Sequence, residues 1–440
     1  DGSAAASTAD AAATGARSAA PTGDAPQSLD ITITVREGKR HELRLGGGLG
    51  FESLGGLIGD DIDDANSTRL EARGRAELTV LSFLDPLLTL RLSALPGFLL
   101  VATEDEDPSP VFEARGEFSR NDFLLPRLTL GGLAAYSVDS LDSYSTQGPR
   151  LGLQIDRQLA GEDSTGFGLL APDSPKPGSP GNRILLSFGI YGQWVDIDPN
   201  DGISLDQLQS PSTLPIVYLL QSLTIDGRDD RLSPRTGFLF DQSLEQGLSL
   251  SGDRGLYFRS LTDVRIYLAL GSRLSLAGRA RGGFLITQDE QDSPITQRFY
   301  SGGSSSHRGF GLRRLAPFAI TDDAASNAAL GSGDLAPFGG DVLLETSLGL
   351  RMLVRKWAAS SLGLALFVDA GDVVGSLGDL DSFVPHVAVG AGLRYNTSVL
   401  PIRFDLARRM NRLTSCQIGS CGDPDPDRRW VFHFSVGEAF

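Results

Sequence analysis

The chain contains little sulfur and no long apolar run. Of its 440 residues, two are cysteine and two are methionine. A membrane-spanning helix needs about 20 consecutive apolar residues. The longest apolar stretch, Leu95–Ala102, is far shorter and contains Pro96 and Gly97. The residues present therefore predict no membrane-spanning helix.

Basic charge is also scarce. The formal net charge is -16, which argues against nucleic acid as a partner, because phosphate binding needs clustered Lys and Arg. Hydrophobic residues make up 40% of the chain and charged residues 21%, so it is not an acidic disordered chain throughout. Its 53 glycines suit a protein built of strands and turns.

Few residues are suited to metal binding or catalysis. Cys416 and Cys421 are spaced C-x4-C in a polar stretch, and two thiols alone do not make a zinc site. We predict a disulfide in an oxidising compartment, with two free thiols as the alternative. The histidines show no zinc-like spacing, and Ser304–Ser306 beside His307 does not match a nucleophile elbow. We expect no metal, no cofactor and no enzyme activity.

The chain divides into three segments. Residues 1–28 are rich in Ala, Ser, Thr, Gly and Pro, and we predict disorder because they offer almost no apolar surface to bury. Residues 29–40 contain one alternating strand and a turn. From 41 to 440, segments of about 9 to 13 residues alternate between apolar and polar side chains, as strands of a half-buried sheet do. In Leu362–Asp369, for example, Leu366 and Val368 share one face and Phe367 and Asp369 share the other.

The connections alternate between short and long. Short turns such as SPRTG and GSR follow one end of the segments, and long acidic loops such as ATEDEDPSP follow the other. Residues 161–182 break this rule, because a long connection falls on the short-turn side. A soluble sandwich would also alternate, but we favour an all-β transmembrane barrel of about sixteen antiparallel strands. In the last segment Trp430, Phe432, Phe434 and Phe440 share one face, which indicates an interfacial aromatic girdle, with an ordinary amphipathic edge strand as the alternative.

Several motifs, in order along the chain, resemble those of the Omp85 superfamily, also called the bacterial surface antigen D15 barrel. They are LTIDGRDDRLSPRTGFLF, RFYSGGSSSHRGFG, GGDVLLETSLGLR, FVDAGDV, VGAGLRYNTSVLPIRFDLA and FSVGEAF. Within the family the chain looks most like TamA-type members. The resemblance implies a sixteen-stranded outer-membrane barrel of a Gram-negative bacterium, usually preceded by periplasmic POTRA domains. Residues 29–40 look like the last strand of such a module, so we expect no complete POTRA domain in this chain.

The resemblance gives the long loop 6 a role as a plug. It implies that Arg308, followed by Gly309 and Phe310, reaches into the lumen toward acidic and aromatic partners. The alternation independently places Phe367 and Asp369 on the lumenal face, and Glu345 is a further candidate partner. Gly302 and Gly303 would let the loop turn back tightly. The alternative is a solvated arginine on a surface loop.

The first barrel strand contains Gly46, Gly47, Gly48 and Gly50, which weaken a strand interior. We predict a lateral gate where this strand meets the last one, at Phe434, Gly437 and Phe440. The alternative is that the glycines only make room for the plug. A client strand would add to the opened edge.

The leading prediction is a protein insertase or translocase of the outer membrane. Its expected partners are outer-membrane lipid and lipopolysaccharide, unfolded outer-membrane protein or autotransporter clients, and a TamB-like subunit. A gated or passive pore and a two-partner secretion exporter are the alternatives.

Overall fold

The fold was examined in a computed structural model. It describes residues 40–54, 68–101, 109–141, 143–161, 183–200, 202–231, 233–251, 255–288, 293–320, 335–358, 360–397, 401–411 and 429–437. The predictions for residues 1–39, for the pair Cys416 and Cys421, and for Phe440 fall outside these ranges. So do residues 162–182, the long connection on the short-turn side.

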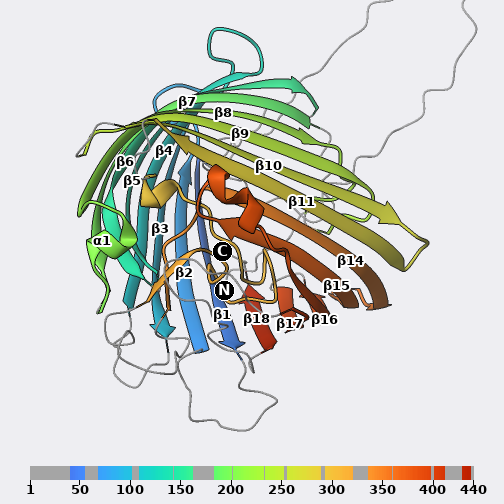
Figure 1. Cartoon of the computed structure of the whole chain (residues 1–440). Helices are drawn as coiled ribbons and strands as arrows, with labels where there is room; N and C mark the ends of the chain where they lie inside the picture. Colours follow the sequence, from blue (N-terminus) through green and yellow to red (C-terminus); the bar gives the residue numbers. More distant parts are fainter. Residues whose placement is uncertain are drawn as a thin grey trace, which may run out of the picture. The chain divides into compact units, whose positions relative to one another are not determined.

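Sixteen antiparallel strands close into a barrel, as predicted (Figure 1). The wall is made of β1 (His41–Leu54), β2 (Thr68–Val80), β3 (Leu88–Val101), β4 (Ser109–Arg120), β5 (Leu128–Ser140), β6 (Tyr144–Ala160), β7 (Arg183–Pro199), β8 (Thr213–Asp226), β9 (Gly237–Ser249), β10 (Leu256–Ala269), β11 (Leu274–Thr287), β14 (Val342–Lys356), β15 (Ser360–Val374), β16 (His386–Thr397), β17 (Pro401–Arg409) and β18 (Trp430–Gly437). Each strand pairs with its sequence neighbour, and β18 pairs with β1 to close the barrel.

The two faces of the wall follow the alternation of the sequence. On β15, Leu366 and Val368 are 59% and 44% exposed on the outside, while Phe367 and Asp369 are 4% and 1% exposed on the inside. This is the pattern of a barrel with an apolar band toward lipid and polar side chains toward the lumen. No helix among the described residues is long and apolar enough to span a bilayer.

Three connections at the end of the barrel opposite the short turns carry structure of their own, and the one between β15 and β16 contains the 3-10 helix η5 (Leu377–Ser382). The connection between β7 and β8 contains helix α1 (Leu205–Leu208). Loop 6, residues 288–341, joins β11 to β14 and contains the 3-10 helix η2 (Ile295–Gln297) and the small sheet of β12 (Phe318–Ile320) and β13 (Leu335–Pro337). Loop 6 and α1 pack on lumenal side chains in one buried cluster that includes Tyr191, Leu208, Ile295, Phe299 and Leu343.

Candidate functional site: the tip of loop 6

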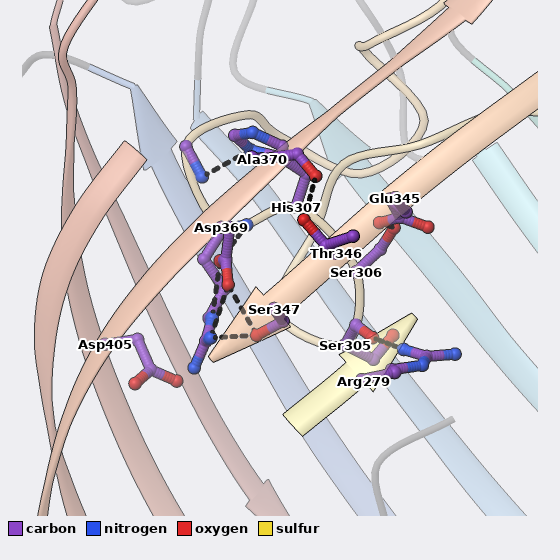
Figure 2. A network of polar contacts seen from close by, with 12 residues as sticks. Arg279, Ser305, Ser306, His307, Glu345, Thr346, Ser347, Asp369, Ala370 and Asp405 are labelled. Carbon is purple, nitrogen blue, oxygen red and sulfur yellow. Dashed lines mark hydrogen bonds and ion pairs between the residues drawn. The ribbon is translucent and has the colours of Figure 1, made fainter. Parts of the chain in front are cut away.

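The tip of loop 6, residues 302–311, is held to the lumenal wall by Arg308. Its Nε donates to Asp369 Oδ2 at 2.8 Å and its Nη2 donates to Oδ1 at 2.6 Å, and its backbone N–H donates to Oδ2 at 3.0 Å. Nη2 also donates to Ser347 Oγ at 3.0 Å, and that hydroxyl donates to Asp369 Oδ1 at 2.7 Å. Ser347 and Asp369 are directly opposite on β14 and β15 (Figure 2). The guanidinium fork therefore matches a carboxylate fixed by the neighbouring strand.

Phe367 forms the surface on which this guanidinium lies. The Arg308 Cζ is 3.5 Å from the centre of the Phe367 ring. The ring occupies space that a side chain on β16 would fill, because a Cβ added to Gly390 would lie 2.3 Å from Phe367 Cζ. Arg308 thus gains a cation–π contact as well as an ion pair in a buried setting.

The residues on either side of Arg308 are also buried. His307 Nε2 donates to the carbonyl of His386 at 2.6 Å. The Phe310 ring packs edge-on against the rings of His307 and His386, at centroid distances of 5.0 and 5.5 Å. At Gly309 the loop comes so close to β16 that a Cβ would lie 2.6 Å from the Cβ of Ala388. Glycine is therefore required at position 309 for the loop to approach the wall.

His433 attaches the last strand to the same tip. Its Nε2 donates to the carbonyl of Arg308 at 3.0 Å, and the side chain is 2% exposed. The histidine lies on the lumenal face of β18 and faces Glu52 of β1 across the closing pair of strands. The sequence alternation places His433 on this face but gives no sign of its partner.

Glu345 differs from the expectation, because it does not contact Arg308. Its Oε1 accepts hydrogen bonds from Ser301 and Ser306 of loop 6, and its Oε2 lies 3.3 Å from Arg281 Nη1. Arg281 is directly opposite Glu345 in the β11–β14 register, and it forms the ion pair with this carboxylate in place of Arg308. Ser347, two residues further along the same face, fills the role that we assigned to Glu345.

Gly302 and Gly303 form the turn that brings the tip back. Their φ angles are +105° and +99°, in the left-handed region that disfavours a side chain. The N–H of Gly303 donates to the carbonyl of Phe310 at 2.9 Å, which closes the tip on itself. This agrees with the role that the sequence predicts for these two glycines.

A second arginine anchors the outer part of loop 6. Arg298 is 6% exposed, and its guanidinium donates to the carbonyls of Ser293, Leu208, Gln209 and Phe338 at 2.9 to 3.4 Å. Leu208 and Gln209 belong to the connection between β7 and β8. The loop is therefore fixed at its tip by a carboxylate and further out by main-chain oxygens. The sequence does not reveal this second attachment.

Pairing of β1 with β18 closes the barrel. Among the described residues it runs from Gly48 opposite Gly437 to Leu54 opposite Val431, and β1 and β2 pair from His41 to Ser53. Gly48 and Gly50 lie within the described part of this closing seam. Phe51 and Phe432 pack edge-on across the seam at 6.3 Å, and Phe434 packs against Phe404 at 4.7 Å.

The Omp85 superfamily domain matches residues 112–440, most of the barrel. The chain belongs to the Omp85 superfamily. It is 31% identical over 146 residues to the outer membrane protein assembly factor BamA of Nitratidesulfovibrio vulgaris, a match that covers 31% of this chain and 18% of that relative. The chain thus spans a minor part of this relative's length.

The fold is shared with a solved BamA structure. BamA from Haemophilus ducreyi lacking POTRA domains 1–3 superposes with a TM-score of 0.58 at 15% identity, over 90% of this chain and 71% of that one. CdiB from Acinetobacter baumannii gives a TM-score of 0.49 at 12% identity, over 89% of this chain and 59% of that one. The family and the sixteen-stranded fold place this Omp85 barrel in the outer membrane of a Gram-negative bacterium. The closer likeness to TamA-type members stays a prediction.

Proposed function

We propose that this Omp85 barrel inserts outer-membrane proteins, or exports them, through a lateral opening between β1 and β18. The proposal rests on one observation above all: alternate residues on the lumenal face of the middle of β1 are glycines. Leu45 and Leu49 are 75% and 50% exposed on the outer face, so Gly46, Gly48 and Gly50 point toward the lumen. At Gly48 and Gly50 no β1 side chain reinforces the backbone ladder on the lumenal face, and Phe51 packs on Phe432 across the seam.

An opened seam would supply what a closed barrel lacks. A barrel with every strand paired has no free edge on which a client strand can form. Parting of β1 from β18 would expose two edges, and a client strand could pair with either by β-augmentation. Similarity to a relative named as an outer membrane protein assembly factor supports the proposal that the clients are outer-membrane proteins. Unfolded barrel proteins and autotransporters are the clients that we propose, and a TamB-like subunit and lipopolysaccharide are proposed partners.

The test is client folding in liposomes. Gly50→Cys/Ser435→Cys places two cysteines directly opposite across the seam, in a background of Cys416→Ser and Cys421→Ser. An unfolded autotransporter barrel is added, and its protease-resistant folding is followed with the seam oxidised and reduced. Faster folding only when the seam is reduced supports the proposal. Equal acceleration in both states refutes the lateral opening, and steady ion conductance without acceleration indicates a pore.

A further inference from the structure

Three arginines gather on the lumenal wall on the short-turn side of the plug. They are Arg351 of β14, Arg394 of β16 and Arg403 of β17, and Arg394 and Arg403 are directly opposite each other. Arg351 shares its face with Glu345 and Ser347, and Arg403 shares its face with buried Asp405, so all three point into the lumen. Arg351 and Arg403 are exposed there.

Among the described residues, this cluster has fewer carboxylates than arginines. Asp405 is its carboxylate, and Arg394 Nη2 already contacts both oxygens, at 2.6 and 2.7 Å. Arg351 lies over the ring of Tyr267 at 5.5 Å. In the part of the chain that the structure describes, neither Arg351 nor Arg403 forms an ion pair.

Four other lumenal arginines have carboxylates, whereas Arg259 donates to the carbonyl of Gln297. Arg265 and Arg279 share Asp263, Arg281 meets Glu345, and Arg308 meets Asp369. Like charges at directly opposite positions on neighbouring strands destabilise a sheet. The cluster of Arg351, Arg394 and Arg403 therefore carries a cost that an anion from outside the chain would offset.

We propose that these three arginines form an anion-binding site for the carboxylates of an acidic polypeptide segment that enters the lumen from the periplasmic side. The inward orientation removes the site from lipid headgroups. The loop-6 tip binds at Ser347, four residues nearer the outer end of β14 than Arg351, so the plug lies between the site and the cell surface. Arginine forks suit carboxylates and phosphates alike.

The size of the cluster favours a polypeptide over a single phosphate. Arg351 and Arg403 are three strands apart, roughly 14 Å at about 4.8 Å per strand. An extended peptide presents side chains of one face about 6.8 Å apart, so alternate acidic residues can reach several arginines at once. On the wall between them Gly363 and Ala365 are small, whereas the space at Gly392 is filled by the side chains of Asp405 and Arg394. This inference rests on the proposed function, which gives a polypeptide a reason to enter the lumen. Binding of an acidic peptide can nevertheless be measured separately from client folding.

The experiment measures fluorescence anisotropy of a fluorescein-labelled decaglutamate peptide with the folded, detergent-solubilised full chain. Arg403→Gln is expected to weaken binding about five- to tenfold, and Arg351→Gln/Arg403→Gln more. Arg403→Lys, which keeps the charge, should stay closer to wild type. Arg408→Gln is the matched control, because Arg408 is on the same strand but on the outer face, over Trp430. Heat-modifiability on gels confirms that each variant is folded.

The outcomes separate the alternatives. Binding lost in Arg403→Gln and kept in Arg408→Gln supports the site. Equal binding in wild type and the double variant, or equal loss in Arg408→Gln, overturns it. Inorganic phosphate that binds more tightly than the peptide would reassign the site to phosphate groups. A barrel that folds clients without binding the peptide refutes this inference alone, and one that binds the peptide without folding clients refutes the proposed function alone.

Discussion

Replacement of Arg308 by alanine should release the tip of loop 6 from the wall. The change removes two charge-assisted hydrogen bonds to Asp369, one to Ser347 and the contact with Phe367. Removal of one partner of a buried ion pair costs about 3–5 kcal/mol, because the other charge is left buried. Asp369 keeps the Ser347 hydroxyl and the N–H of residue 308, so we expect the lower end, about 3 kcal/mol. That raises the undocked population of the tip about 100-fold.

Hydrogen exchange of the tip measures this population directly. The N–H groups of residues 308, 309 and 310 are bonded to Asp369, the His307 ring and the His307 carbonyl when the tip is docked. Exchange of a protected amide follows the free energy of local opening. Arg308→Ala should therefore speed exchange in residues 304–311 by about 100-fold while the strands stay protected. Arg308→Lys keeps the charge but loses the two-pronged guanidinium, so its exchange rate should lie between those of wild type and Arg308→Ala.

Arg403→Ala is the control, because it removes a lumenal arginine that does not hold the tip. Unchanged exchange of residues 304–311 in Arg308→Ala would refute the assignment of Arg308 as the anchor. The same acceleration in Arg403→Ala would show that any loss of lumenal charge loosens the loop.

Three further predictions follow from the contacts of the loop and the turns. Arg298→Met should leave the carbonyls of Ser293, Leu208, Gln209 and Phe338 without this donor and lower the temperature at which the barrel unfolds on gels, and Arg298→Lys should not restore it. Gly309→Ala should undock the tip, because its Cβ would lie 2.6 Å from Ala388 Cβ, which tip exchange would detect. In the turn between β8 and β9, burial raises the pKa of Asp229, but N–H donors of Arg235 and Thr236 outweigh it, so the pKa lies below 3.8. Because the pKa of Asp229 is lower in the folded than in the unfolded chain, the ionised carboxylate stabilises this turn above about pH 4. That stabilisation is lost as the pH falls further. A carboxyl NMR titration of Asp229 measures the folded pKa.

The sequence predicts the barrel well because its signal is periodic. Alternation places Phe367 and Asp369 inside and Leu366 and Val368 outside, and a strand has no other way to present them. An even number of strands is consistent with both ends of the barrel lying on one side of the membrane. The turn at Gly302 and Gly303 is equally local, because glycine permits a positive φ without steric cost.

The sequence could not predict which lumenal residues meet loop 6. Glu345, Ser347 and Asp369 share one face of the wall, and all three could accept an arginine. The outcome depends on the depth that the loop reaches and on Arg281, which occupies Glu345 from the neighbouring strand. Arg298 is also beyond sequence reasoning, because its acceptors are main-chain oxygens from another connection, and a carbonyl carries no sequence signature.

The contacts of the tip explain why β1 would be the strand that parts. Arg308 holds β14 and β15 through Ser347 and Asp369, and His307 meets the carbonyl of His386 on β16. His433 fastens β18 to the Arg308 carbonyl. On the other side of the seam, β1 presents Gly46, Gly48 and Gly50 to the lumen, and a glycine has no side chain with which to reach the plug. On one side of the seam, β18 is bonded to the plug through His433. On the other side, the glycines in the middle of β1 offer no side chain that could bond to the plug. An opening there would leave the plug and its strands in place while β1 moves with β2, with which it pairs from His41 to Ser53.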